Sequence, residues 1–182
     1  MINTIYIEDE IADHPRTKKL IKRFPSATII SCTRYTEIFN RKSQNFRLQK
    51  KNPALILAKK YKGMVLPTPK HYGIGAKYNY YFSHMLNCVY DCRYCFLQGM
   101  FRSAHYILFV NYEDFIDEIN STLNKHASDN VHFFSGYDCD SLALDSVSNF
   151  ISDFLPFFEN HQNTLIELRT KSTQIKSLLQ RS

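Results

Sequence analysis

The chain has 182 residues, 44% of them hydrophobic, and a formal net charge of +6. This length and composition favour one domain, or one domain with a small lobe, and exclude a disordered or collagen-like protein. No apolar run approaches the roughly 18 residues of a membrane-spanning helix. Acidic residues already occur at positions 8–10, so we expect a cytoplasmic protein with no membrane partner.

Residues 1–65 are expected to form a basic N-terminal α/β lobe. Alternating or β-branched apolar residues predict short strands over residues 3–9, 27–32 and 54–58. A basic helix is predicted over residues 15–24, between the first two strands. The polar stretch 34–51 is expected to be an exposed helix or an ordered loop.

Much of the positive charge lies in this N-terminal part of the chain. Its cations include Lys18, Lys19, Lys22, Arg23, Arg41, Lys42, Lys50, Lys51, Lys59, Lys60 and Lys62. A basic surface lowers the free energy of approach to phosphates, and interleaved aromatic side chains can stack on bases. On charge alone, a nucleic-acid surface and an ordinary solvated face remain alternatives.

Residues 66–77 are predicted to be a linker, because Pro67, Pro69, Gly73 and Gly75 make this the stretch richest in turn-forming residues.

Residues 78–182 are predicted to contain three successive β/α units. The expected strands cover residues 78–86, 131–135 and 164–170, and the expected helices cover residues 112–126, 146–160 and 173–180. Asn111 is placed to cap the first helix, with Glu113 and Asp114 in its first turn. Successive β/α units predict a parallel sheet, open or closing into a partial barrel.

Three of the five cysteines fall within eight residues, which favours a metal site with reduced thiols over a disulfide framework. Cys88, Cys92 and Cys95 form a C-x3-C-x2-C set between a predicted strand and a short helix. Closely spaced thiolates on one loop can bind an iron–sulfur cubane. Three ligands leave one iron open, and an open iron can chelate the amino and carboxylate groups of a small molecule.

The alternative is a zinc knuckle in which His84 or another histidine supplies the fourth ligand of a closed tetrahedral site. Structural zinc sites usually combine two separated ligand pairs, whereas Cys32 and Cys139 each stand alone. Cys32 is instead expected to be a core residue.

Residues 88–95 resemble the signature of the radical S-adenosylmethionine superfamily, including Tyr94 directly before the last cysteine. The flanking segments are similar to the spore photoproduct lyase family, and this similarity covers nearly the whole chain. The segments that carry it are residues 5–8, 95–98, 106–107, 110–111, 140–145 and 168–172.

The resemblance implies a partial (β/α) barrel of radical S-adenosylmethionine type, preceded by the small α/β lobe and truncated after the third β/α unit. It implies a [4Fe–4S] cluster and S-adenosylmethionine as cofactors. In the family, an electron from the cluster cleaves S-adenosylmethionine to a 5′-deoxyadenosyl radical, which abstracts hydrogen from a thymine dimer in DNA. The implied partners are DNA and an electron donor such as a flavodoxin or ferredoxin.

The resemblance also assigns residues to the cofactor. Tyr94 takes the position that lies against the adenine, and Gly136 lies in the turn that meets the methionine amino group. Ser141 and Lys171 match positions near the cofactor, although Lys171 is equally a candidate for a solvated helix start. The acid that family members carry after this turn is absent.

The hydrogen-donating cysteine of the family has two possible counterparts. Aligned without gaps on residues 140–145, Tyr137 falls at its position, which implies weak or no dimer repair. With a small gap Cys139 is the donor; otherwise Cys139 is a small buried residue. Asp140 is expected to cap its loop rather than to act in catalysis.

Two function classes follow. The first is a radical enzyme acting on a DNA thymine lesion or a related nucleic acid. The second is an iron–sulfur or zinc-binding module, or a truncated fragment, without turnover.

Overall fold

The computed structural model describes residues 2–179. Its contacts divide the chain into two compact units. Unit 1 comprises Met1–Lys60 and Met85–Val110, and unit 2 comprises Tyr61–His84 and Asn111–Ser182. The segment that contains the three clustered cysteines therefore belongs to the same unit as the N-terminal strands. The expected domains, 1–65, 66–77 and 78–182, stay a prediction.

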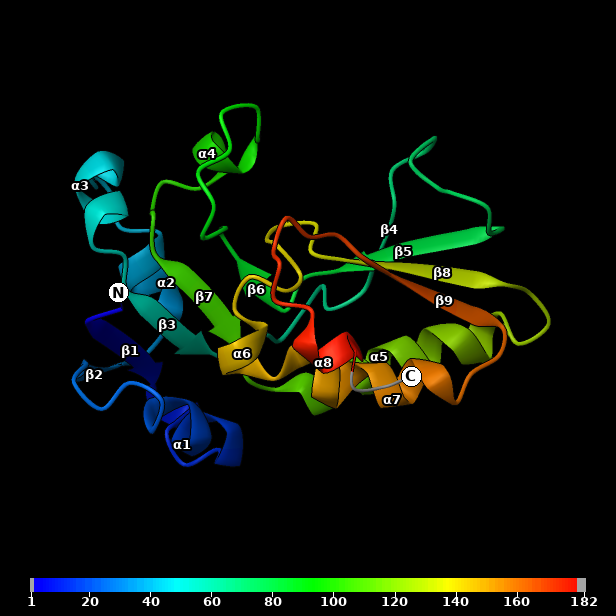
Figure 1. Ribbon diagram of the computed structural model, residues 1–182, viewed down its shortest axis with the longest axis horizontal. Coiled ribbons are helices and arrows are strands. Elements are labelled where there is room, and N and C mark those ends of the chain that lie inside the picture. The colour runs from blue at the N-terminus through cyan, green and yellow to red at the C-terminus, as the bar shows by residue number, and fades with distance from the viewer. Residues whose placement is uncertain (1, 180–182) are drawn as a thin grey trace. The chain divides into compact units, whose positions relative to one another are not determined.

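Unit 1 is built on a five-stranded sheet with the order β2-β1-β3-β7-β6 (Figure 1). The strands are β1 Thr4–Glu8, β2 Thr28–Cys32, β3 Leu55–Ala58, β6 Met85–Leu86 and β7 Tyr106–Phe109. The first four strands in this order are parallel, and β6 is antiparallel to β7. The three strands expected in the lobe are confirmed, whereas β7 was not predicted.

Short helices accompany this sheet. They are η1 Asp9–Ile11, α1 Pro15–Ile21, α2 Tyr35–Phe39, α3 Phe46–Lys51 and α4 Leu97–Met100. Helix α1 confirms the predicted basic helix. The polar stretch 34–51 contains α2 and α3, and Asn45 caps α3 by accepting a hydrogen bond from the Leu48 N–H at 3.1 Å.

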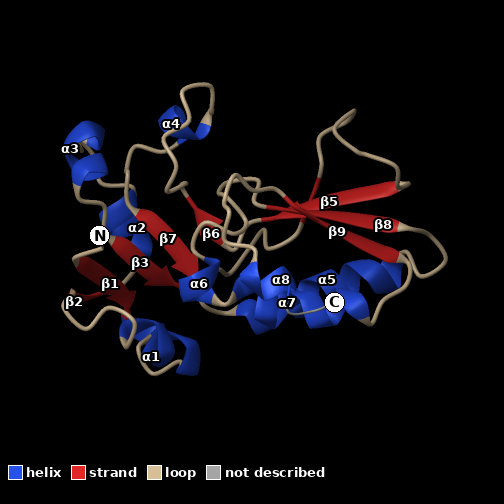
Figure 2. Cartoon of the chain, in the orientation of Figure 1, coloured by secondary structure: helices blue, strands red, loops and turns tan. Residues whose placement is uncertain are grey.

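Unit 2 is built on a four-stranded sheet with the order β4-β5-β8-β9. Figure 2 shows β5, β8 and β9 side by side in this sheet. The strands are β4 Leu66–Pro67, β5 Tyr78–Phe82, β8 Val131–Ser135 and β9 Thr164–Leu168. β5, β8 and β9 are parallel, as the β/α pattern predicted, and β4 pairs antiparallel with β5. The helices are α5 Tyr112–Lys125, α6 Asp145–Ser148, α7 Phe150–Glu159 and α8 Lys176–Leu179.

Aromatic side chains join the sheet of unit 2 to its helices. Phe82 of β5 is 1% exposed and stacks on Phe154 of α7, with ring centroids 5.4 Å apart. Phe115 of α5 lies against Phe154 at 6.3 Å. Burial of one such side chain stabilises the fold by about 1.5–3 kcal/mol. This packing holds β5 and β8 firmly on the helices, so the loops that follow the strands start from fixed positions.

Three local expectations need correction. The strand expected over residues 78–86 is divided, because β5 ends at Phe82 and β6 joins the other sheet. The helix expected over residues 146–160 is interrupted at Asn149, whose φ of 52° is left-handed. Asn111 precedes α5 but its side chain accepts no capping hydrogen bond; its amide donates to Asp114 at 2.7 Å.

Within the described part of the chain, no helix has both the length and the apolar character needed to cross a membrane.

Candidate functional site

The three clustered cysteines lie on the loop between β6 and β7 of unit 1, residues 87–105, which we call the cysteine loop. Cys88, Cys92 and Cys95 form no disulfide, and each is half-buried. The Cys95 N–H donates to the Cys92 carbonyl at 3.0 Å, so the last two cysteines share one turn. The Tyr90 N–H donates to Cys88 Sγ at 3.5 Å, a contact that would also stabilise a thiolate there.

The base of the cysteine loop is closed by Asn87, directly before the first cysteine. Asn87 is 4% exposed and has a φ of 67°, a left-handed conformation that asparagine tolerates better than most residues. Its amide donates to the carbonyls of Ser103 and His105, each at 2.7 Å. These two bonds join the outgoing and returning ends of the loop.

Helix α3 also supports the cysteine loop. The Gln49 side-chain oxygen accepts from the Ala104 N–H at 2.9 Å, and Lys50 Nζ donates to the Cys88 carbonyl at 3.3 Å. Sequence reasoning missed Gln49, Lys50 and Asn87 as loop supports. The available signal was an asparagine next to the first cysteine, since asparagine is enriched at positive φ.

The donor set of the cysteine loop fits an iron–sulfur cluster in chemical type, because thiolates are the usual ligands of such clusters. In this structure the three sulfur atoms do not converge on a common metal position. Within residues 2–179, no group of three or more His, Cys, Asp or Glu side chains is arranged to hold a metal ion. Tyr94, between the last two cysteines, is fully exposed.

Cys32 and His84 are both buried, each in a different unit. Cys32 is 8% exposed, and burial together with the nearby Glu8 carboxylate raises the pKa of its thiol to about 11. It therefore stays protonated at neutral pH, and its expected place in the core is confirmed. His84 belongs to unit 2, where it is 1% exposed and stacks on Phe150 at 3.9 Å.

The carboxyl ends of β5, β8 and β9 meet at one edge of the unit 2 sheet, because the three strands are parallel. We call the loops there, residues 136–144 after β8 and 169–175 after β9, the edge loops. Ser135 and Ser141 share a hydrogen bond between their hydroxyls at 2.6 Å, and the Ser141 N–H donates to the Arg169 carbonyl at 2.9 Å. Each edge loop is thus held against the other.

Gly136 is required by this close approach. Its φ is 75°, and a Cβ at this position would lie 2.5 Å from Ser141 Oγ and 3.0 Å from Ser141 N. This Cβ would also lie 3.2 Å from the Arg169 carbonyl oxygen of the other edge loop, so a residue without a side chain is needed where the loop after β8 folds back and meets the loop after β9.

The structure brings Gly136, Ser141 and Lys171 to this one edge, in the two edge loops. Ser141 is 1% exposed, whereas the Lys171 side chain is exposed and its backbone N–H donates to Asp140 at 2.6 Å. Their expected contact with a cofactor stays a prediction.

The two candidates for the hydrogen donor differ in exposure. Tyr137 is half-buried and stacks on Tyr81 of β5, with ring centroids 4.3 Å apart. Burial, and then the nearby Asp138 and Tyr137, raise the pKa of the Tyr81 hydroxyl. Cys139 is 6% exposed. The choice between Tyr137 and Cys139 stays open.

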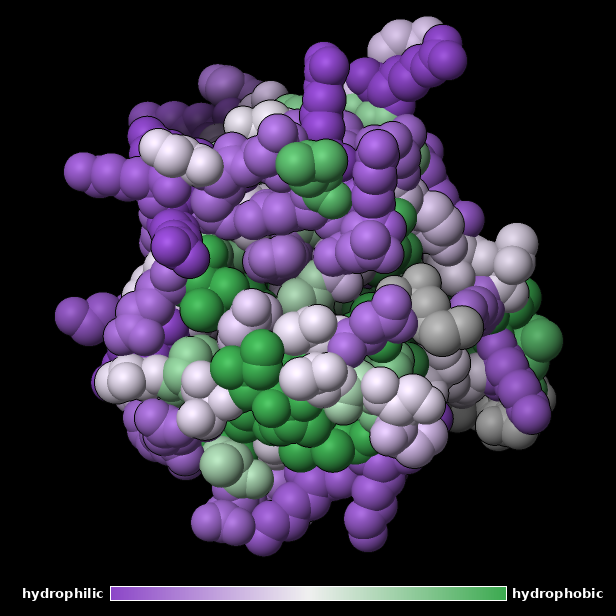
Figure 3. All heavy atoms as spheres, turned by 90° about the vertical axis from the view of Figure 1, so that its left-hand side faces the viewer, coloured by the Kyte–Doolittle hydropathy of each residue, from purple (hydrophilic) through white to green (hydrophobic). Residues whose placement is uncertain are grey.

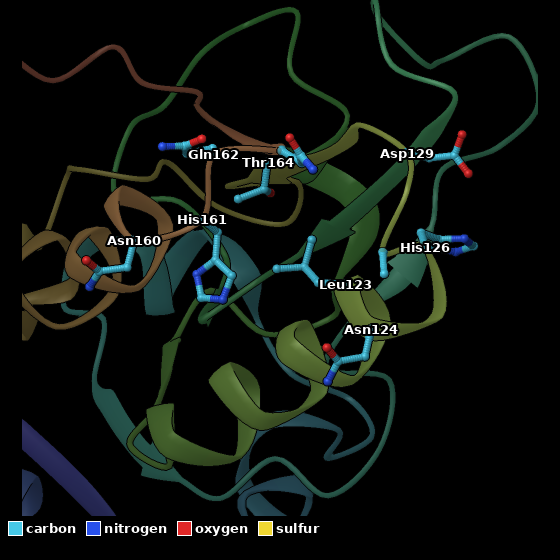
Figure 4. A pocket seen from close by; sticks show the side chains of 10 residues that line it. Leu123, Asn124, His126, Asp129, Asn160, His161, Gln162 and Thr164 are labelled. Carbon is cyan, nitrogen blue, oxygen red and sulfur yellow. The ribbon is translucent and has the colours of Figure 1, made fainter.

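A separate pocket of unit 2 lies at the opposite, amino ends of β8 and β9 (Figure 4). It has a volume of about 330 Å³ and lies beside the carboxyl ends of α5 and α7. Its histidines have structural partners: His126 bonds the Tyr80 hydroxyl at 2.8 Å, and His161 bonds the Phe157 carbonyl at 2.7 Å. Ligand sites of α/β sheets lie at the carboxyl ends of the strands, so the edge loops are the better candidate.

Unit 1 carries the predicted basic surface. Figure 3 shows one side of the molecule, where hydrophilic side chains surround a smaller apolar patch. Arg41 and Lys42 are exposed and line a hollow of about 410 Å³ together with Ser43 and Gln44. Arg41 and Lys42 give the rim of this hollow a positive charge.

Comparison with known proteins identifies relatives of this chain. The family model described as spore photoproduct lyase matches residues 1–182. A cysteine-substituted spore photoproduct lyase with bound AdoMet and dinucleoside spore photoproduct has a similar structure, with a TM-score of 0.82 and 18% identity. A spore photoproduct lyase complexed with dinucleoside spore photoproduct matches with a TM-score of 0.80, also at 18% identity. No curated protein matches the chain significantly.

Both structural matches cover 98% of this chain and 52% of the other chain, so this chain spans about half the length of the structures it matches. The likeness confirms the expected fold, a partial (β/α) barrel preceded by a small α/β lobe.

Proposed function

Because the chain belongs to the spore photoproduct lyase family, we propose that it is a [4Fe–4S]-dependent radical S-adenosylmethionine protein that acts on a thymine lesion in DNA or a related nucleic acid. The observation that carries the proposal is the cysteine loop, where three half-buried cysteines that form no disulfide lie within eight residues on a loop closed at its base. When bound, the cluster would supply the electron that cleaves S-adenosylmethionine to a 5′-deoxyadenosyl radical.

In this proposal Cys88, Cys92 and Cys95 hold the cluster irons. Asn87 fixes the base of the cysteine loop, and Lys50 holds the backbone at Cys88 through its bond to the carbonyl. Cluster binding would draw the three sulfurs together, because the free energy of metal binding can order its ligands.

The residues proposed for S-adenosylmethionine are Tyr94 and three residues of the edge loops, Gly136, Ser141 and Lys171. Gly136 lies in the turn proposed to meet the methionine amino group, and its missing side chain lets this turn pack closely on Ser141. The exposed Lys171 ammonium offers a charge for a carboxylate, and the exposed Tyr94 ring offers a face for adenine stacking. Cys139, or Tyr137 in the ungapped alignment, is the proposed hydrogen donor.

Anaerobic reconstitution with iron and sulfide tests the proposal. We expect a cubane absorption spectrum and, after reduction, 5′-deoxyadenosine released from S-adenosylmethionine. Stoichiometric zinc without iron would instead favour a zinc-binding module. A cubane without cleavage would favour a non-catalytic iron–sulfur module.

Nucleic acid is the second part of the proposal, and the exposed cations of unit 1 support it. Binding of a duplex oligonucleotide should weaken steeply with salt, because each neutralised phosphate releases counterions. Fluorescence anisotropy from low to physiological salt measures this dependence, and a flat response would remove nucleic acid from the proposal. Arg41→Gln with Lys42→Gln should reduce the salt slope, whereas Lys125→Gln in α5 of unit 2 is the matched control.

A further inference from the structure

Asp140 connects the two edge loops of unit 2 through a single buried carboxylate. It is 7% exposed. Oδ1 accepts hydrogen bonds from the N–H groups of Leu142 and Ala143 at 2.9 and 2.8 Å and from the Thr170 hydroxyl at 2.7 Å. Oδ2 accepts from the Lys171 N–H at 2.6 Å.

These four bonds serve two different purposes. The bonds from Leu142 and Ala143 stay within the loop after β8, and they are the local capping that the sequence predicted. The bonds from Thr170 and Lys171 reach the loop after β9. They connect segments that are 30 and 31 residues apart in the chain.

The residues next to Asp140 and Thr170 make further hydrogen bonds at the place where the two edge loops meet. Ser141, next to Asp140, donates its N–H to the Arg169 carbonyl at 2.9 Å. The Thr170 hydroxyl, which donates to Asp140, also accepts from the Ser172 N–H at 2.8 Å. The backbone on both sides of Lys171 is therefore fixed, although its side chain is exposed.

We infer that Asp140 is a positioning residue for S-adenosylmethionine. Its hydrogen bonds connect the two edge loops, so that Ser141 and Lys171 have one fixed arrangement before the ligand binds. This role rests on the proposed function. A pre-ordered site binds more tightly, because less loop entropy is lost when the ligand arrives. Asp140 itself contacts the loops and not the ligand.

Asp140→Asn is the most selective test. An asparagine has one acceptor oxygen and one NH₂ donor group, whereas a carboxylate has two acceptor oxygens. The oxygen will face the three donors that Oδ1 serves, which leaves the NH₂ group against the Lys171 N–H. The substitution therefore keeps the local cap and breaks the bond to Lys171. Thr170→Val, a change of nearly equal shape, removes the other bond from Asp140 to the loop after β9, together with the bond that the hydroxyl accepts from Ser172.

Asp145→Asn is the matched control. Asp145 is 3% exposed and accepts from the Ile151 N–H at 2.9 Å and from the Ser177 hydroxyl at 2.6 Å. The Ser177 hydroxyl can reverse and accept from an amide, so this variant keeps both bonds. It changes a buried carboxylate in the same way without touching the contact between the edge loops.

The three variants and the native protein are compared by hydrogen exchange and by calorimetric titration with S-adenosylmethionine after anaerobic reconstitution. Asp140→Asn should accelerate exchange of the Lys171 amide and weaken S-adenosylmethionine binding by about tenfold, the effect of one lost hydrogen bond to a charged group. Thr170→Val should weaken binding in the same direction. Iron content should stay native in every variant, and Asp145→Asn should bind as the native protein does.

The possible failures are distinguishable. Native affinity in Asp140→Asn, or an equal loss of affinity in Asp145→Asn, would overturn the role of Asp140 and leave the proposed function standing. A native protein that carries its cluster but binds no S-adenosylmethionine would overturn both.

Discussion

Replacing Cys92 with alanine should abolish nearly all iron bound after anaerobic reconstitution. Cys92 lies between the other two ligands of the proposed cluster, and its backbone carbonyl accepts the Cys95 N–H at 3.0 Å. An alanine keeps this turn and removes only the sulfur. With two thiolates on the cysteine loop, a cubane would have two uncovered irons instead of one. Iron and sulfide analysis, with the absorption spectrum, measures the loss, and Cys88→Ala and Cys95→Ala should behave alike.

Cys32→Ala provides the control for this prediction. Cys32 is in the same unit, but it is buried and its raised pKa, about 11, keeps the thiol protonated. A protonated thiol is a poor metal ligand. Cys32→Ala should therefore keep native iron content while losing some stability. Iron that survives in the Cys92 variant, or that disappears equally in the Cys32 variant, would contradict the assignment of the ligands.

The sequence predicts those parts of the fold whose signal is local. The period of two in β1 and the apolar face of α5 depend on neighbours within a few residues, so both elements are found without knowledge of the rest of the chain. The division of the strand expected over residues 78–86 has no local signal. The break at Ser83 and His84 falls inside a continuous aromatic and apolar stretch, and only the pairing with β7 assigns Met85 and Leu86 to another sheet.

The candidate site also has some parts with a local sequence signal and others without one. The cysteine loop was predictable because ligand spacing is a property of the sequence itself. The capping role of Asp140 was predictable too, since short acidic side chains bond nearby N–H groups. Its bonds to Thr170 and Lys171 were not, because they exist only when β8 and β9 are neighbours in the sheet. The hydrogen bond between the Ser135 and Ser141 hydroxyls was not predictable either, because it forms only when the loop after β8 folds back toward the end of that strand.

Gly136→Ala should lower the free energy of unfolding by about 2–5 kcal/mol, the sum of two costs. The first is the left-handed backbone, which disfavours a residue with a Cβ by about 1–2 kcal/mol. The second is steric, because the new Cβ would lie 2.5 Å from Ser141 Oγ and 3.2 Å from the Arg169 carbonyl oxygen. Overpacking of this kind costs about 1–3 kcal/mol. Urea denaturation followed by circular dichroism measures the loss.

Gly75→Ala separates these two costs, because Gly75 is in the same unit with a φ of 73° and has no atom within 4 Å of an added Cβ. It should lose only the backbone part, about 1–2 kcal/mol. The difference between the two variants then measures the packing of Gly136 against Ser141 in its own loop and against Arg169 in the other edge loop. Because that contact orders Ser141, Gly136→Ala should also weaken S-adenosylmethionine binding, and Gly75→Ala should not. Equal destabilisation of the two variants would show that the edge loops move apart without cost, which would contradict a fixed arrangement of Ser141 and Lys171.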